Sequence, residues 1–175
     1  MRDLLIRFLM ALGTAAQLAS APGGPCLAAE PAALIFADEQ GLSRSLSSAE
    51  LAKLARKTIK VTGSDNQTSE YEGIPLATLL EHCGVVLGKE LRGPRVANYL
   101  LIEATDGYRV SLAIAEVDPA TTDKVVLLAD KKNGVALPEK EAPWRLVIPD
   151  DKRPVRWVRM VQRISVRAPA TEAAK

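Results

Sequence analysis

The sequence is short of the residues that ordinarily build metal centres and nucleophilic active sites. Its 175 residues include one histidine, His82, and two cysteines, Cys26 and Cys83. A single imidazole excludes a metal site made of several histidines, and neither a Ser-His-Asp nor a His-Glu-x-x-His pattern is present. We therefore predict no catalytic side chain and no metal ligand from these patterns.

Aromatic residues and excess charge are also scarce. Aromatics make up 4% of the chain, and the formal net charge is +2. Stacking platforms for single strands need aromatic rings, and phosphate backbones need a strongly basic surface. The composition therefore predicts no nucleic-acid partner, while 47% apolar residues suffice for one ordinary folded domain.

Long apolar runs are absent after the N-terminus, where none approaches the about 20 residues of a membrane span. The N-terminus itself reads as a secretory signal, because Arg2 and Arg7 precede a mostly apolar stretch over 8–21. Small residues at 27–29 suit a signal peptidase. We predict a signal peptide over 1–29, a periplasmic protein, and no membrane anchor after cleavage.

Cysteine usage follows from that cleavage. Removal of residues 1–29 takes Cys26 away and leaves Cys83 as the one thiol, so no internal disulfide is expected. Cys83 and His82 lie at the end of a predicted helix. There we expect the cysteine to be a small buried apolar residue rather than a nucleophile. We expect the histidine to be a cation that interacts favourably with the C-terminal end of the helix, rather than a metal ligand.

Two helices are predicted from their boundary residues. Ser47 and Glu50 form a capping box, which predicts a helix over 48–57. Pro75 suits the first turn of a second helix with an apolar leucine face, and Gly84 suits its end.

Alternating and β-branched segments predict the strands, listed here in chain order: 33–36, 58–62, 97–104, 108–112, 124–129, 146–148, 155–158 and 160–166. In the last of these, Ile164 and Val166 are expected to point inward, and Arg163, Ser165 and Arg167 outward. Residues 30–44 read as a lead-in, 63–70 as an exposed loop, and 168–175 as a frayed tail. Hairpins dominate over βα units, partly through the Asp106-Gly107 and Asn133-Gly134 turns. The predicted class is therefore α+β, with one domain over 45–167.

Four cations surround one predicted turn near the C-terminus, beside Trp144 and Trp157, the two tryptophans of the chain. They are Arg145, Lys152, Arg153 and Arg156. Guanidinium groups match carboxylates and phosphates, so the turn is a candidate anion site. The alternative is a solvated basic loop beside two core tryptophans.

In their order and spacing, several motifs resemble the oxidoreductase molybdopterin-binding domain of the sulfite oxidase type, over roughly 45–167. The motifs are Tyr71-x-Gly73-Ile74-Pro75-Leu76-x-x-Leu79-Leu80, Asp106-Gly107-Tyr108, Val126-Leu127-Leu128-Ala129, Asn133-Gly134 with Leu137, Pro143-x-Arg145-Leu146-Val147-x-Pro149, Arg156-Trp157-Val158 and Ile164-x-Val166.

This resemblance implies layered sheets with few helices, and a pterin held by basic groups in loops. Carried onto this chain, it makes Arg145 and Arg156 the leading candidates for contact with a ligand. The remaining candidates are Lys152, Arg153, Trp157, Asp106 and Tyr108. The alternative role for Arg145 is a buried ion pair between strand and hairpin, with Asp106 as the candidate partner.

The sequence differs from the family pattern at the residue that would bind the metal. The resemblance implies a cysteine thiolate on molybdenum, in the loop that corresponds to 63–70, and this loop has no cysteine. Serine and aspartate are hard oxygen ligands that replace a soft thiolate poorly. Arg2 and Arg7 also do not form the twin-arginine pair that would export a folded, cofactor-loaded enzyme.

Three interpretations remain open. The first is a periplasmic accessory domain without molybdenum or another cofactor, which binds an anionic small molecule or a periplasmic protein partner. The second is a molybdopterin-dependent oxidoreductase of the sulfite oxidase type. The third is a purely structural interaction domain.

Overall fold

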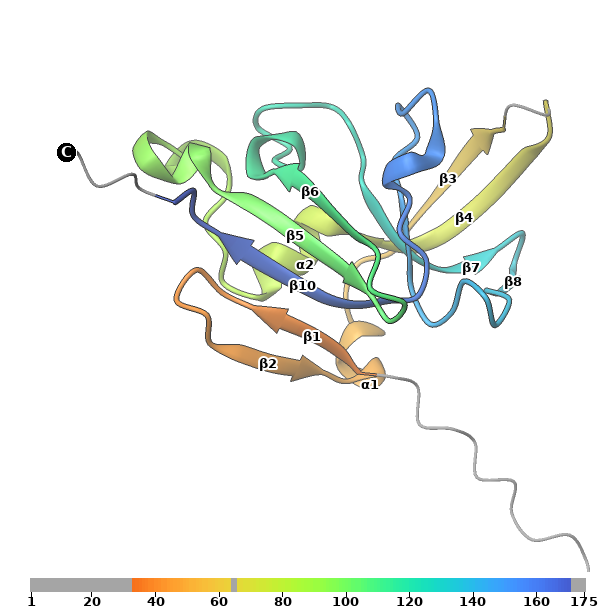
Figure 1. Ribbon diagram of the computed structural model, residues 1–175. Coiled ribbons are helices and arrows are strands. Elements are labelled where there is room, and N and C mark those ends of the chain that lie inside the picture. The colour runs from red at the N-terminus through yellow and green to blue at the C-terminus, as the bar shows by residue number, and fades with distance from the viewer. Residues whose placement is uncertain (1–32, 64–65, 171–175) are drawn as a thin grey trace, which may run out of the picture.

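The computed structural model describes residues 33–63 and 66–170, and it contains two five-stranded sheets with few helices (Figure 1). The predicted α+β class is therefore confirmed. The predicted signal peptide, with Cys26, lies outside the described residues, as does the end of the predicted tail. None of the described helices has the length and apolar character needed to cross a membrane.

The first sheet, called sheet A, joins the two ends of the described chain. Its strands are β1 (Leu34–Ala37), β2 (Ser43–Leu46), β5 (Tyr99–Ala104), β6 (Arg109–Ala113) and β10 (Val161–Arg167). They lie in the order β2-β1-β10-β5-β6, and only the β1–β10 pair is parallel. The segment predicted as a lead-in, 30–44, thus contains β1 and the start of β2.

The second sheet, called sheet B, is antiparallel throughout. Its strands are β3 (Lys57–Thr62), β4 (Thr68–Pro75), β7 (Leu127–Lys132), β8 (Val135–Ala136) and β9 (Arg145–Val147). The order is β3-β4-β7-β8, and β9 pairs with β7. At Gly73 a Cβ atom would lie 2.1 Å from the Leu128 carbonyl oxygen, so only glycine lets β4 and β7 approach this closely.

The helices are α1 (Ser48–Leu51), α2 (Leu76–His82) and four short 3₁₀ segments, η1 (Gly88–Glu90), η2 (Gly93–Ala97), η3 (Ile114–Glu116) and η4 (Pro154–Arg156). Three leucines of α2 are fully buried in the main core, together with sheet A residues such as Ile102 and Ile164 and with Leu128 and Leu146 of sheet B. Figure 1 shows α2 behind β5 and β10. A smaller cluster of Tyr71, Leu127, Ala129 and Val147 lies on the other face of sheet B.

Several boundary predictions are confirmed. Ser47 caps α1 through its hydroxyl oxygen, which accepts from the Glu50 amide at 3.2 Å. Gly84 follows α2 with φ +82°, as a helix-ending glycine does. The Asp106-Gly107 and Asn133-Gly134 pairs form hairpin turns between β5 and β6 and between β7 and β8.

Other predictions were wrong because tertiary contacts override local pattern. The first helix ends at Leu51 rather than at 57, and the chain is drawn into β3 beside Arg56, which pairs with Glu72 and Asp130. The exposed loop predicted over 63–70 is shorter than expected, because strand β4 already begins at Thr68.

The predicted strand over 155–158 is not a strand, because the 3₁₀ turn η4 occupies its first half and no strand follows. Ser165 was predicted to point outward, yet its exposed fraction is 0%. It lies on the central strand of sheet A, in register with Ala37 of β1 and Leu101 of β5, so a strand flanks it on each side.

Candidate ligand-binding site

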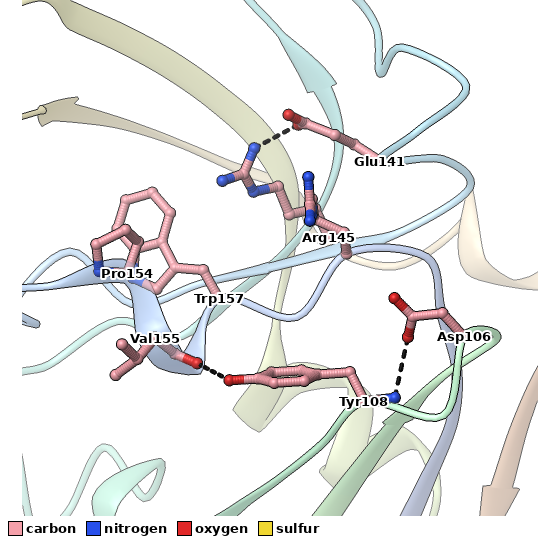
Figure 2. A pocket seen from close by; sticks show the side chains of 8 residues that line it. Asp106, Tyr108, Glu141, Arg145, Pro154, Val155 and Trp157 are labelled. Carbon is pink, nitrogen blue, oxygen red and sulfur yellow. Dashed lines mark hydrogen bonds and ion pairs between the residues drawn. The ribbon is translucent and has the colours of Figure 1, made fainter.

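A pocket of about 330 Å³ opens where the β5–β6 turn, the start of β9 and the η4 segment meet. Its lining residues are Asp106, Tyr108, Glu141, Arg145, Pro154, Val155, Trp157 and Arg159. Figure 2 shows the labelled side chains converging from these separate segments. The volume is at the small end of the about 300–1,000 Å³ typical of ligand sites.

Arg145 enters the pocket because side chains alternate along β9. Leu146 faces the main core, while Arg145 and Val147 face the side of sheet B that carries Tyr71. The Arg145 guanidinium lies 5.5 Å from the Tyr71 ring centroid and 5.6 Å from that of Trp157. Both distances are within the range of cation–π attraction.

Arg145 is also held by one carboxylate. Its Nη1 forms an ion pair with Glu141, and the two side chains are 13% and 17% exposed. Sequence reasoning offered Asp106 as the partner, but the partner in the structure is Glu141. The Arg145 Nε is buried with no hydrogen-bond partner among the described residues. A buried donor without an acceptor destabilises the folded state by about 1–3 kcal/mol. A further hydrogen-bond acceptor at this guanidinium would therefore be stabilising.

Trp157 forms an apolar wall of the pocket. Its indole N–H donates to the Ile148 carbonyl at 3.0 Å, so the ring offers its face rather than a donor. Tyr71 meets the ring edge-on, with centroids 6.0 Å apart. Trp157 also lines a second pocket of about 210 Å³, with Val61, Gly63, Gln67, Ser69, Tyr71 and Lys132. Trp144 differs, because it is 6% exposed and packs in the main core.

The β5–β6 turn supplies the opposite rim. An Asp106 carboxylate oxygen accepts from the Tyr108 amide at 2.9 Å, which fixes the turn. The Tyr108 hydroxyl donates to the Val155 carbonyl at 2.6 Å and so ties the turn to η4. Tyr108 and Val155 are 49% and 57% exposed, so they form an apolar edge open to solvent.

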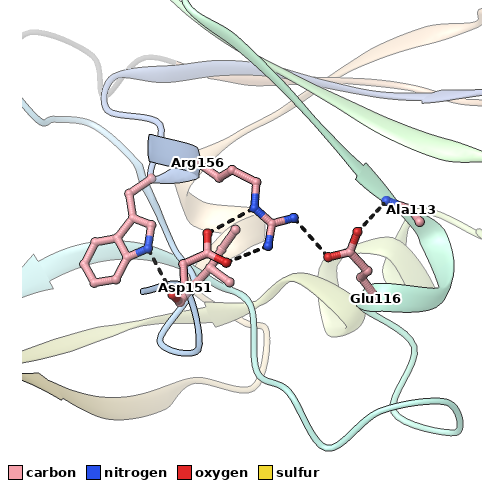
Figure 3. Close-up of polar contacts among 6 residues, drawn as sticks. Ala113, Glu116, Asp151 and Arg156 are labelled. Carbon is pink, nitrogen blue, oxygen red and sulfur yellow. Dashed lines mark hydrogen bonds and ion pairs between the residues drawn. The ribbon is translucent and has the colours of Figure 1, made fainter. Parts of the chain in front are cut away.

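Arg156 lies outside this pocket, in a second cluster shown in Figure 3. Its Nε and Nη2 donate to the two Asp151 oxygens at 3.0 and 2.6 Å, and its Nη1 donates to Glu116 at 3.0 Å. These bonds, Asp151 first and Glu116 second, raise the pKa of Arg156 above its ordinary value. Two carboxylates therefore satisfy this guanidinium, which joins its own loop to η3.

Lys152 and Arg153 also stay outside the pocket, exposed and without an ion-pair partner in the described part of the chain. The structure thus brings together four of the predicted site residues, namely Asp106, Tyr108, Arg145 and Trp157. It separates the other three from them. Sequence reasoning missed Glu141 and Arg159, and no local pattern marks either one.

Cys83 is on another part of the molecule. It follows the last residue of α2, packs partly buried against the main core, and lines a separate pocket with residues such as Asp38 and Arg95. Burial raises the pKa of the Cys83 thiol, against the opposing effect of Arg44. The thiol is only partly buried and lies beside Arg44, rather than being buried as predicted.

His82 is in the last turn of α2, as expected. Its Nε2 lies 2.9 Å from a Glu50 carboxylate oxygen, so it links α2 to α1. Within residues 33–63 and 66–170, no group of three or more His, Cys, Asp or Glu residues could hold a metal ion.

Comparison with known proteins gives a family and a fold. The family model "Oxidoreductase molybdopterin binding domain" matches residues 42–174. The crystal structure of the sulfane dehydrogenase SoxCD from Paracoccus pantotrophus is similar, with a TM-score of 0.61 and 23% sequence identity. The match covers 81% of this chain and 39% of that one, and at this identity it shows a shared fold. A search of curated protein sequences gave no match.

Proposed function

The chain belongs to the oxidoreductase molybdopterin-binding domain family, and from this premise we propose that it is a member without molybdenum redox chemistry. In this proposal it is a periplasmic accessory domain. It binds the anionic group of a small ligand, or of a partner protein, in the pocket at Arg145.

The observation that carries the proposal is the position of the thiol. Molybdenum in this family would need a soft thiolate, and the tip of the β3–β4 hairpin over 63–67 contains no cysteine. Cys83 lines a different pocket from Arg145 and Trp157. The groups around Arg145 are carboxylates, guanidiniums and aromatic rings, and none of them is a soft ligand that suits molybdenum. The proposed function therefore includes no step at a molybdenum centre.

The binding role rests on the environment of Arg145. Charged groups are seldom buried without full pairing, and Arg145 keeps a buried N–H that no described residue satisfies. It lies within cation–π distance of two aromatic rings and lines an open pocket. With a small turn of the guanidinium toward the pocket, an incoming carboxylate or phosphate oxygen would supply the acceptor that the folded chain leaves out.

A molybdopterin-dependent oxidoreductase is the competing function, and the family match is what favours it. The test is to express the full chain in a host that makes the molybdenum cofactor, with a known molybdoenzyme as a positive control. Metal is then measured by mass spectrometry, and pterin by fluorescence after oxidation. We expect background molybdenum in the wild type and in Cys83→Ser alike.

Stoichiometric molybdenum in the wild type would overturn the proposal. If Cys83→Ser removed that metal, the metal would depend on this thiol. Fractionation of cells that express the full chain tests export separately, and we expect the processed chain in the periplasmic fraction.

A structural domain without a ligand is the third interpretation, and a ligand screen separates it from the first. Carboxylate- and phosphate-bearing compounds are tested by thermal shift on the wild type and on Arg145→Met. A ligand that binds only the folded state raises the melting temperature in proportion to RT ln(1 + [L]/Kd). We expect such a shift in the wild type and its loss in the variant.

A further inference from the structure

We propose that the ligand of the Arg145 pocket carries a positive group as well as an anionic one, on a small apolar body. This class includes α-amino acids with apolar side chains and short peptides. The inference deepens the proposed function, on which it rests, by naming the chemical class of the ligand.

The charge of the pocket is the first argument. Its lining includes two carboxylates, Asp106 and Glu141, and two guanidiniums, Arg145 and Arg159, so it has no net formal charge. A ligand with only negative charge would be attracted by the arginines and repelled by the acids. A ligand that carries both charges can match both signs, which is how charge complementarity sets specificity.

The unused hydrogen-bonding groups are the second argument. One Asp106 oxygen accepts from the Tyr108 amide, and the other has no partner in the described structure. On the cationic side, Arg145 uses Nη1 for Glu141, while its buried Nε is unpaired. Arg159 is exposed and makes no ion pair with any described residue. The pocket therefore has a spare acceptor from the β5–β6 turn and spare donors from the two arginines.

The walls are the third argument. The Trp157 indole N–H is already bonded to Ile148, and the Tyr108 hydroxyl proton is given to Val155. These rings, with Pro154 and Val155, offer mainly apolar surface to a ligand. Such a wall suits an aliphatic or aromatic body, and the about 330 Å³ volume suits a small one.

The experiment compares ligands that share a body and differ in charge. Isothermal titration calorimetry is run on the full chain with L-phenylalanine, 3-phenylpropanoate and phenethylamine, which carry both charges, the negative charge alone and the positive charge alone. L-Leucine, 4-methylpentanoate and isopentylamine form a second set, and the dipeptide Ala-Phe extends the series. We expect at least one zwitterion to bind about tenfold or more tighter than both of its single-charge analogues.

Two variants assign the charges to residues. Asp106→Asn keeps an oxygen for the Tyr108 amide but removes the negative charge, so the zwitterion should lose its advantage over the anion. Arg159→Gln should reduce the advantage of the zwitterion over the amine, because one of the two pocket cations is lost. Lys152→Gln, an exposed cation outside the pocket, is the matched control and should change neither ratio. Unfolding curves confirm that each variant is folded.

The outcomes separate this inference from the proposed function. If the anions bind as tightly as the zwitterions, or if no zwitterion of the panel binds, the inference is overturned. The absence of molybdenum would still support the proposed function in that case. Stoichiometric molybdenum in the full chain overturns the proposed function whatever the titrations show.

Discussion

Arg145 and Arg156 flank the same loop, yet they meet opposite environments. Arg156 has two carboxylate partners, one of which takes two of its N–H groups. Arg145 has one carboxylate partner, two aromatic rings and a buried N–H without an acceptor. Arg156 is fully paired within the fold and links two segments, so we call it the brace. Arg145 still has a hydrogen-bond donor available for a ligand.

The difference teaches that a guanidinium gains its role from all the residues that surround it in the fold, whether near or distant in sequence. Glu116 reaches Arg156 from η3, across a long separation in the chain. Asp106 and Tyr108, from a hairpin turn, line the same pocket as Arg145. A run of cations near a tryptophan therefore does not by itself indicate one shared anion site.

Loss of the brace should have the largest effect on stability. Arg156→Met leaves Asp151, whose side chain is 13% exposed, without its partner. We expect the free energy of unfolding to fall by about 2–3 kcal/mol, measured by urea denaturation at pH 7. Arg153→Met, an exposed cation in the same loop, is the control. A stable Arg156→Met that lost ligand binding would reverse the roles of the two arginines.

Replacement of Arg145 should change binding more than stability. Arg145→Met removes the pocket cation, and the affinity for the tightest-binding zwitterion of the panel should fall about tenfold or more. The free energy of unfolding should fall by only about 1 kcal/mol, because Glu141 loses one N–H partner and lines the open pocket, whereas Asp151 loses two N–H partners in Arg156→Met. In Arg145→Met/Glu141→Gln the stability should recover while binding stays weak, since no unpaired charge remains. Calorimetry and urea denaturation together check both expectations.

Tyr108→Phe tests a residue that both lines the Arg145 pocket and bonds to the η4 segment, which contains Arg156. It removes the hydroxyl bond to Val155 but keeps the ring at the pocket rim. Because the residue is half exposed, we expect a loss of about 0.5–1 kcal/mol in urea denaturation. Ligand affinity should change less than in Arg145→Met. A larger loss of affinity than of stability would show that the hydroxyl itself contacts the ligand.

The smallest effects are expected at Lys152 and Arg153. Lys152→Gln and Arg153→Gln change exposed cations that make no ion pair in the described structure. Stability should stay within about 0.5 kcal/mol of wild type, and ligand affinity should be unchanged. Reduced affinity in either variant would restore the predicted four-cation site.

The parts of the fold that depend on local chemistry were predictable from the sequence. Ser47 caps a helix, Gly84 ends one, and Asp106-Gly107 turns a hairpin, because each acts on its own backbone or on near neighbours. The alternating segment over 58–62 and the last strand were found within one residue of their observed bounds.

The errors occur where distant contacts decide the structure. The predicted helix over 48–57 overran the observed end at Leu51, and the segment around Trp157 forms a turn held by Ile148 and Asp151. At the site, proximity in sequence grouped Arg145 with Arg156. Arg145 pairs with Glu141 four residues before it, whereas Arg156 pairs with Asp151 and also with the distant Glu116, so the local pattern did not separate the two roles.

The central position of β10 has a consequence for how the protein is made. This last strand pairs with β1 on one side and with β5 on the other, so it joins the β1–β2 and β5–β6 hairpins into one sheet. A nascent chain still on the ribosome cannot complete sheet A until residues 161–167 have emerged. Assembly of the main core is therefore a late event in biosynthesis, and truncation before Val161 should leave two hairpins with an exposed apolar seam.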